Sequence, residues 1–239
     1  DYLIGTNEFG GAVSSGQSGA IAFESDYRNL QAKKAYFFMG DAMLCLGSGI
    51  NGNFSNPVNT SVNQTLLSGD INFYDGTKQI FTGSEKTATD LQWIHHRNVG
   101  YIFPSGGNIT VQNQQQSGTW RSIHSLGSNA VVNKQVFSLL IDHGNTPANA
   151  SYSYIVVPDK SLNDFEVLAN DHGFVIVKND ADVQAVRNDK VQKYAVVFYN
   201  AGTVDMGDGL TIASNKKAIV LLEKEGAGYK ISAADPTHL

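Results

Sequence analysis

Short runs of apolar residues recur along the whole chain, with Gly, Asn, Asp or Ser between them. The runs are rich in Val, Ile, Tyr and Phe, a pattern typical of antiparallel sandwiches and barrels. The clearest of them cover residues 34–39, 42–46, 91–96, 100–103, 109–111, 136–141, 152–157, 194–199, 210–212 and 218–222. The sequence therefore predicts an all-β fold, an antiparallel β-sandwich with few short helical turns, in one β-rich domain.

The connections between several runs are short. Residues 92–96 and 99–103 are separated only by Arg97 and Asn98, and residues 220–222 meet 229–231 across the turn residues 225–228. Both spacings predict β-hairpins. The best helix signal is the short segment 161–168, where Ser161 is suited to cap the first turn.

The composition indicates a globular chain that folds without covalent staples. It has 239 residues, 41% of them hydrophobic, and a single cysteine, Cys45, inside an apolar run. At this length folding buries roughly three quarters of the unfolded surface. One cysteine excludes a disulfide framework, and we expect Cys45 to be a buried free thiol.

The charge is mildly acidic and spread along the chain. The net charge is −5, and the 17 Lys and Arg occur singly or in pairs. Proteins that bind nucleic acid or anionic membranes concentrate positive charge, so neither partner is expected. No apolar run approaches the roughly 20 residues that span a bilayer. The start at Asp1 has neither Met nor a signal-like leader, which indicates a processed product or a piece of a longer protein.

Local motifs for catalysis are absent from the sequence. No stretch matches a P-loop, a dinucleotide fingerprint, a nucleophile elbow or a His-Glu-x-x-His zinc motif. His95 and His96 are neighbours in a predicted strand, so their side chains point to opposite faces and do not share one metal ion. We expect one imidazole in the core and the other facing outward, and His143 as a hydrogen-bonded turn residue. A catalytic pairing of a histidine with a distant carboxylate stays open.

A series of segments, in order along the chain, carries a family resemblance. It includes Gly-Tyr-Ile-Phe-Pro at 100–104 and Asp-His-Gly at 142–144. The full series covers residues 7–16, 30–38, 44–50, 59–64, 100–104, 137–144, 152–158 and 233–237. Together these segments resemble the central β domain of polysaccharide lyase family 8, which includes the chondroitin AC, hyaluronate and xanthan lyases. The resemblance is closest to the chondroitin AC type.

The resemblance implies a fold and a role. Residues 1–239 would form the central β super-sandwich, a galactose-mutarotase-like antiparallel fold, with the family's N-terminal α/α toroid and small C-terminal β domain absent from the chain. Family members cleave uronic-acid-containing polysaccharides by β-elimination, using Asn, His, Tyr and Arg residues of the toroid. No segment here matches those motifs, so the resemblance implies no catalytic residue and a role as cleft wall and scaffold.

The resemblance also implies partners and a location. The partners are a polysaccharide substrate of the glycosaminoglycan type and the toroid, and the location is secreted or periplasmic in a bacterium. Loops near the start of the β domain reach the sugar chain in the family. Asn7 and Glu8 are therefore the candidate substrate-binding residues.

No cofactor is required by the resemblance, but a structural calcium ion is an open expectation. Glu24 and Asp26 are two residues apart, so both carboxylates face one side of an extended segment, an arrangement that suits a hard cation. The chondroitin AC type is similar in holding calcium in its β domain, and the matching segment is 15–27. Ser15 and Gln17 are not the carboxylates that the resemblance would require, and a plain surface turn is the alternative.

Two other functions compete with the scaffold. A free-standing carbohydrate-binding β-sandwich module would use exposed aromatic rings, of which Trp93 and Trp120 are the ones to test. A mutarotase-like enzyme would use paired histidines and a glutamate on concave strands, and the adjacency of His95 and His96 argues against it.

Overall fold

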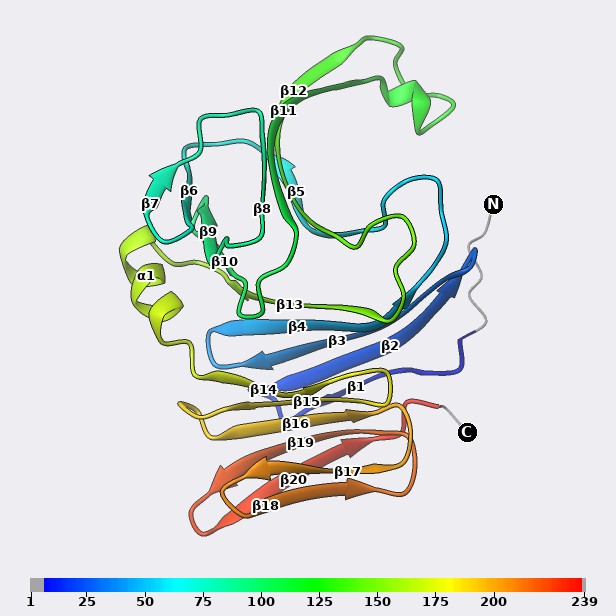
Figure 1. The fold of residues 1–239 in the computed structure, drawn as a ribbon, viewed down its shortest axis with the longest axis vertical. Helices are drawn as coiled ribbons and strands as arrows, with labels where there is room; N and C mark the ends of the chain where they lie inside the picture. The colour runs from blue at the N-terminus through cyan, green and yellow to red at the C-terminus, as the bar shows by residue number, and fades with distance from the viewer. Residues whose placement is uncertain (1–6, 238–239) are drawn as a thin grey trace.

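The structure is a computed structural model that describes residues 7–237. Its strands form four antiparallel sheets, named A to D, which stack in the order B, A, C, D (Figure 1). Within the described residues the helical elements are one α-helix, α1 (Leu162–Asn170), and one 3-10 helix, η1 (Trp120–Ser122). The prediction of an all-β sandwich is confirmed.

Each sheet is built from strands that are antiparallel to their neighbours. Across the nine-stranded sheet A the order is β1 (Gly10–Ser14), β2 (Gly19–Tyr27), β3 (Leu30–Met39), β4 (Ala42–Asn51), β13 (Ala150–Val157), β10 (Val99–Ile102), β9 (Trp93–His96), β6 (Ile71–Tyr74) and β7 (Lys78–Ile80). Sheet B consists of β5 (Asn59–Leu66), β12 (Val132–Asp142), β11 (Ile109–Gly118) and β8 (Glu85–Ala88). Sheet C consists of β14 (Phe174–Asn179), β15 (Val183–Asn188), β16 (Lys193–Phe198), β19 (Ala218–Glu225) and β20 (Gly228–Ala234), and sheet D of β17 (Gly202–Gly207) and β18 (Leu210–Ser214).

The central strands of sheet A are buried on both faces. In β4 every residue from Leu44 to Ile50 is buried, where a sheet with one solvated face would alternate between buried and exposed positions. Leu44 and Leu46 pack into the core toward sheet C, and Cys45 packs into the core toward sheet B. The continuous apolar run that predicted this strand is therefore explained by burial from two sides.

Three hydrophobic cores separate the four layers. The first lies between sheets A and C and contains Phe37, Val197 and Tyr199, and the second lies between sheets A and B and contains Phe137. The third lies between sheets C and D and contains Phe198. Each sheet thus buries its apolar side chains against the next one, which is how stacked sheets become stable.

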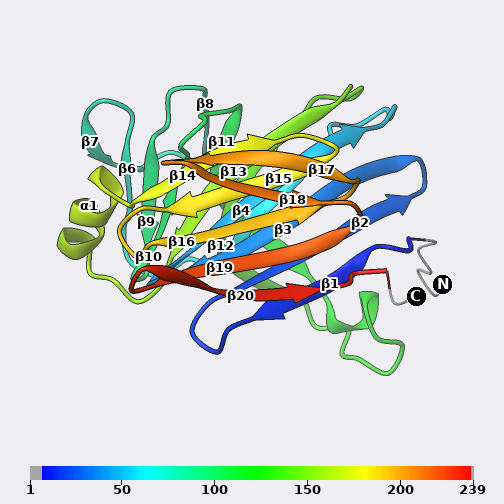
Figure 2. The same ribbon diagram turned by 90° about the horizontal axis from the view of Figure 1, so that it is seen from below.

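The outer strands of sheets A and C are also joined directly. Seen from below, β1 and β20 lie side by side (Figure 2). Gly10 N donates a hydrogen bond to Pro236 O at 3.0 Å, and Pro236 follows β20 closely in sequence. The start and the end of the described chain therefore close the same edge of the stack.

Both predicted hairpins and the predicted helix are confirmed, and β19 and β20 form the second hairpin. β9 and β10 pair with Val99 opposite His96, and the two residues between them have φ of 51° for Arg97 and 60° for Asn98, as a type I′ turn requires. Ser161 Oγ accepts the Asp164 N–H at 3.3 Å and caps α1. No helix within residues 7–237 is both long and apolar enough to cross a bilayer.

The helix α1 is anchored by one aromatic ring. Phe165 is fully buried, and its ring lies against Gly100 of β10, where an added Cβ would sit 1.9 Å from Phe165 Cε2. The Phe165 ring also meets the edge of Trp93, with ring centroids 5.4 Å apart. Any side chain at position 100 would collide with Phe165, so the close approach of the helix to the strand requires glycine there.

Candidate functional site

The predicted sugar-binding residues Asn7 and Glu8 are both exposed just ahead of β1. Asn7 lines a shallow groove of about 290 Å³, together with polar residues of β2 and β3 that include Glu24, Asp26 and Lys33. Glu8 is not among the residues that line it. The structure therefore places Asn7, but not Glu8, in one groove with the carboxylates of Glu24 and Asp26.

The charged groups in this groove are paired with each other. Lys33 Nζ lies 3.2 Å from Glu24 Oε1 and donates a hydrogen bond to Ala181 O at 2.6 Å. Asp26 Oδ2 accepts a hydrogen bond from Gln31 Nε2 at 3.1 Å. The groove thus offers polar groups for hydrogen bonds to a hydroxylated ligand, but neither carboxylate is placed as an unpartnered acid or base.

The residues that the resemblance matches to a calcium site do not lie close together. Ser15 and Gln17 lie in the turn before β2, and Asp26 lies near its other end, about 23 Å along the strand from Gly19 at the usual rise per residue. The positive charge of Lys33 beside Glu24 would also repel a calcium ion at that carboxylate. Within residues 7–237 no three His, Cys, Asp or Glu side chains are grouped as metal ligands. These residues do not fit a calcium ion.

His95 and His96 point to opposite faces of sheet A, as predicted, but neither faces solvent. His95 packs against Phe165 of α1, and its Nε2 is 2.9 Å from Lys160 O. His96 packs against Phe137 of sheet B, and its Nε2 accepts the Ser68 N–H at 3.3 Å. The expectation of one outward imidazole was wrong because α1 covers one face and sheet B covers the other.

His143 occupies a turn, as predicted, and is hydrogen-bonded there. Its Nε2 lies 2.8 Å from Thr60 Oγ1, and burial lowers the pKa of the imidazole. Burial likewise lowers the pKa of His96 and of His172. All three imidazoles therefore bind a proton less readily in the folded protein than in the unfolded chain.

This burial predicts a pH dependence of stability. The unfolded chain binds protons at these histidines below about pH 6.5, whereas the folded chain resists them, so the free energy of unfolding falls as the pH drops below that value. Replacing the ring by His143→Asn flattens the slope, because one linked proton is lost. Urea denaturation at pH 7 and pH 5 measures it, and equal slopes in the variant and the parent would contradict the assignment.

The tyrosines of the landmark segments are structural. Tyr101 is buried, its hydroxyl accepts a hydrogen bond from Asn63 Nδ2, and burial raises its pKa to about 12. Burial also raises the pKa of Tyr152 and of Tyr154, whose rings stack 5.8 Å apart. Burial raises the pKa of the Cys45 thiol to about 12 as well, so it is an inert buried group.

The two tryptophans differ in environment. Trp93 is buried, and its ring stacks on Tyr74 at 5.7 Å, so it serves the core and cannot meet a sugar. Trp120 is 61% exposed, in η1 at the end of the β11–β12 hairpin. Of the two tryptophans considered for stacking on a sugar, Trp120 is the one whose ring is accessible.

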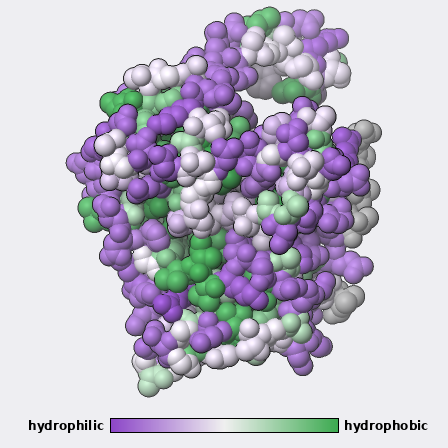
Figure 3. All heavy atoms as spheres, in the orientation of Figure 1, coloured by the Kyte–Doolittle hydropathy of each residue, from purple (hydrophilic) through white to green (hydrophobic). Residues whose placement is uncertain are grey.

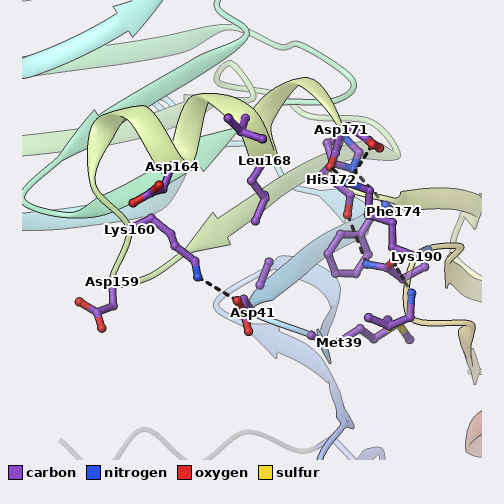
Figure 4. Close-up of a pocket in the computed structure, with 15 residues that line it drawn as sticks. Met39, Asp41, Asp159, Lys160, Asp164, Leu168, Asp171, His172, Phe174 and Lys190 are labelled. Carbon is purple, nitrogen blue, oxygen red and sulfur yellow. Dashed lines mark hydrogen bonds and ion pairs between the residues drawn. The ribbon is translucent and has the colours of Figure 1, made fainter.

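A larger groove, which the sequence did not reveal, lies under α1 (Figure 4). It has a volume of about 690 Å³ and is lined by residues of the β3–β4 turn, α1, the segment that leads into β14 and the β15–β16 connection. Two ion pairs lie in it, Lys160 with Asp41 and Lys190 with Asp171, each with N···O of 2.8 Å. His172 Nδ1 accepts the Phe174 N–H at 3.1 Å, so the lysines and the histidine of this groove are already engaged.

Two family models match the chain. The model described as polysaccharide lyase family 8, super-sandwich domain, matches residues 2–169, and the model described as polysaccharide lyase family 8, C-terminal beta-sandwich domain, matches residues 175–239. The second match coincides with sheets C and D. This division differs from the expectation of a single central domain over residues 1–239 with the small C-terminal β domain outside the chain.

Known proteins are similar over almost the whole chain. Chondroitinase-AC of Pedobacter heparinus is 37% identical, over 97% of this chain and 33% of its own length, and xanthan lyase of a Bacillus species is 31% identical, over 93% and 25%. A solved structure of chondroitinase AC lyase in oligosaccharide complexes superposes with a TM-score of 0.89 at 35% identity, covering 96% of this chain and 34% of that one. The chain thus spans about a third or less of the length of these relatives.

Proposed function

This chain belongs to polysaccharide lyase family 8, and we propose that it is the non-catalytic β-sandwich part of an enzyme that cleaves uronic-acid-containing polysaccharides by β-elimination. The proposal includes a helical toroid elsewhere in the longer protein, with this chain as its scaffold and as one wall of the substrate cleft. The bacterial relatives named chondroitinase, xanthan lyase and hyaluronate lyase support this substrate class. A secreted or periplasmic location is part of the same proposal.

The observation that supports a non-catalytic role is the state of the titratable groups. β-Elimination needs a group that neutralises the uronate, a base for the C5 proton and an acid for the leaving oxygen. Among the described residues, the buried histidines and tyrosines are engaged in packing and hydrogen bonds, as His95, His143 and Tyr101 illustrate. Because these groups are engaged, we infer that residues outside this chain carry out the reaction.

Asn7 and Glu8 remain our proposal for the part of the chain that meets the sugar. Both are exposed, and Asn7 lies in a groove with polar side chains that offer both donors and acceptors. These are the features that sugar hydroxyls require in a binding site.

A lyase assay tests the proposed role. We expect the chain of residues 1–239 to form no unsaturated uronate from chondroitin, hyaluronan or xanthan, as followed by ultraviolet absorbance. A longer form of the protein that includes the preceding helical region should be active, because it supplies the acid and the base. Chondroitinase-AC of Pedobacter heparinus is the positive control, and circular dichroism confirms that the inactive chain is folded. Turnover by residues 1–239 alone would refute the non-catalytic role.

A further inference from the structure

The β11–β12 hairpin extends beyond the sheet that supports it (Figure 1). β8 pairs with β11 only from Ile109 to Gln112, and β5 pairs with β12 only from Val136 onward. Asn113 N still donates a hydrogen bond to Ser84 O, and Gln135 O accepts one from Leu67 N. Past these two residues the strands pair only with each other, and the space-filling view shows their tip standing clear of the body (Figure 3). The end of this hairpin, residues 119–131, is called the hairpin tip.

The hairpin tip is folded on itself and holds Trp120 outward. His124 N and Arg121 N donate hydrogen bonds to Trp120 O and Ser128 O, each at 3.0 Å. An added Cβ at Gly127 would lie 2.6 Å from the Trp120 carbonyl, so the loop closes tightly over its own backbone. The backbone that carries Trp120 is thus held in place and its side chain is 61% exposed, and a preorganised backbone lowers the entropic cost of binding a ligand.

The sequence of the hairpin itself carries charge of one sign. Residues 91–141 contain Arg97, Arg121 and Lys134 but no Asp or Glu, whereas the whole chain has 22 acidic and 17 basic residues. Arg121 forms no ion pair with any residue in the described part of the chain. Of the amide side chains on the strand that leads to the tip, Gln112 and Gln114 donate hydrogen bonds to Glu85 of the neighbouring strand β8, whereas Gln115 and Gln116, nearer the tip, are exposed. An anionic and hydroxylated ligand complements this combination.

We propose that the hairpin tip is an accessory binding site for a uronate-containing polysaccharide. The Trp120 ring packs against the apolar face of one sugar ring, and the Arg121 guanidinium pairs with a uronate carboxylate of the same or the next sugar. The inference rests on the proposed function for its ligand class, and it adds a contact on sheet B that is separate from the groove at Asn7. Aliphatic side chains at the tip, such as Leu126, make a protein contact the competing outcome.

Binding measurements with the chain of residues 1–239 test this site. We expect hyaluronan and chondroitin sulfate to bind, and neutral dextran not to bind. Trp120→Ala and Arg121→Glu each weaken binding about ten-fold, which corresponds to roughly 1.4 kcal/mol. Trp120→Phe keeps most of the affinity because it retains an aromatic ring. Calorimetric titration or affinity electrophoresis gives the dissociation constants.

Matched controls distinguish a specific binding site from non-specific electrostatic or hydrophobic attraction. Lys216→Glu makes the same charge change in the exposed β18–β19 connection, and Leu126→Ala removes a more exposed apolar side chain from the same tip; both should bind within about two-fold of the parent. Equal losses in Arg121→Glu and Lys216→Glu, equal binding of dextran, or no binding by the parent chain would overturn the inference. Self-association that Leu126→Ala abolishes, without an effect of Trp120→Ala on sugar binding, would assign the tip to a protein contact instead. None of these results affects the lyase assay, so the two proposals fail separately.

Discussion

Gly47→Ala should destabilise the protein by about 3 kcal/mol, the upper end of the usual cost of overpacking a core. Gly47 of β4 is paired with Tyr152 of β13, and the tyrosine ring lies directly over it. An added Cβ would sit 2.0 Å from Tyr152 Cε1 and 2.4 Å from Cζ, well inside contact distance. The ring has little freedom to move because it is buried between Tyr154 and His143, with centroid distances of 5.8 Å and 5.9 Å.

Urea denaturation of the Gly47→Ala variant measures this cost. Gly118→Ala is the matched control, because nothing lies within 4 Å of its added Cβ, and we expect its stability within about 0.5 kcal/mol of the parent. If the collision with the ring is the cause, Gly47→Ala should cost much less in a Tyr152→Leu background, because contacting residues are not additive. Equal effects of Gly47→Ala in both backgrounds would contradict this explanation.

The local elements of the fold were predictable because their signals are local. The hairpin at Arg97 and Asn98 follows from two residues between two apolar runs, and the cap at Ser161 follows from one side chain that accepts a backbone N–H. The opposite directions of His95 and His96 follow from the period of a strand. These features depend on neighbours in sequence, and the structure confirms them.

The stacking of layers was not predictable in the same way. Gln184 is fully buried, and it joins sheets A and C by accepting from Tyr199 Oη at 2.8 Å and donating to Ser48 Oγ at 3.3 Å. No local pattern predicts that a glutamine is buried in this way, because Tyr199 and Ser48 are 15 and 136 residues away from it in sequence. The same applies to His96, which is covered by a sheet formed from distant strands.

The boundary between the two matched domains could not be predicted from the sequence for a related reason. The core between sheets A and C is continuous, with Phe37 and Val197 in one cluster, and α1 leads into β14 within four residues. No Pro-rich or Gly-rich linker marks the change. A sequence without such a linker gave no signal for dividing the chain, and the groove under α1 remained unseen because it forms at this junction.

Phe165→Ala should be strongly destabilising, with a loss of about 3–5 kcal/mol in the free energy of unfolding. The Phe165 ring is fully buried and holds α1 against Gly100, Trp93 and His95. Its removal leaves a cavity between helix and sheet that the stiff strands β9 and β10 cannot close. Val167→Ala in the same helix is the control, because Val167 is 74% exposed and should change stability by no more than about 0.5 kcal/mol.

A double-mutant cycle with Gly100 tests the assigned contact itself. Gly100→Ala alone should be strongly destabilising, because its Cβ would collide with the Phe165 ring at 1.9 Å. In the Phe165→Ala background the same methyl enters the space that the ring has left, so it should cost little and can even restore stability by filling the cavity. Additive effects of the two substitutions would mean that α1 is held on the sheet by contacts other than this one.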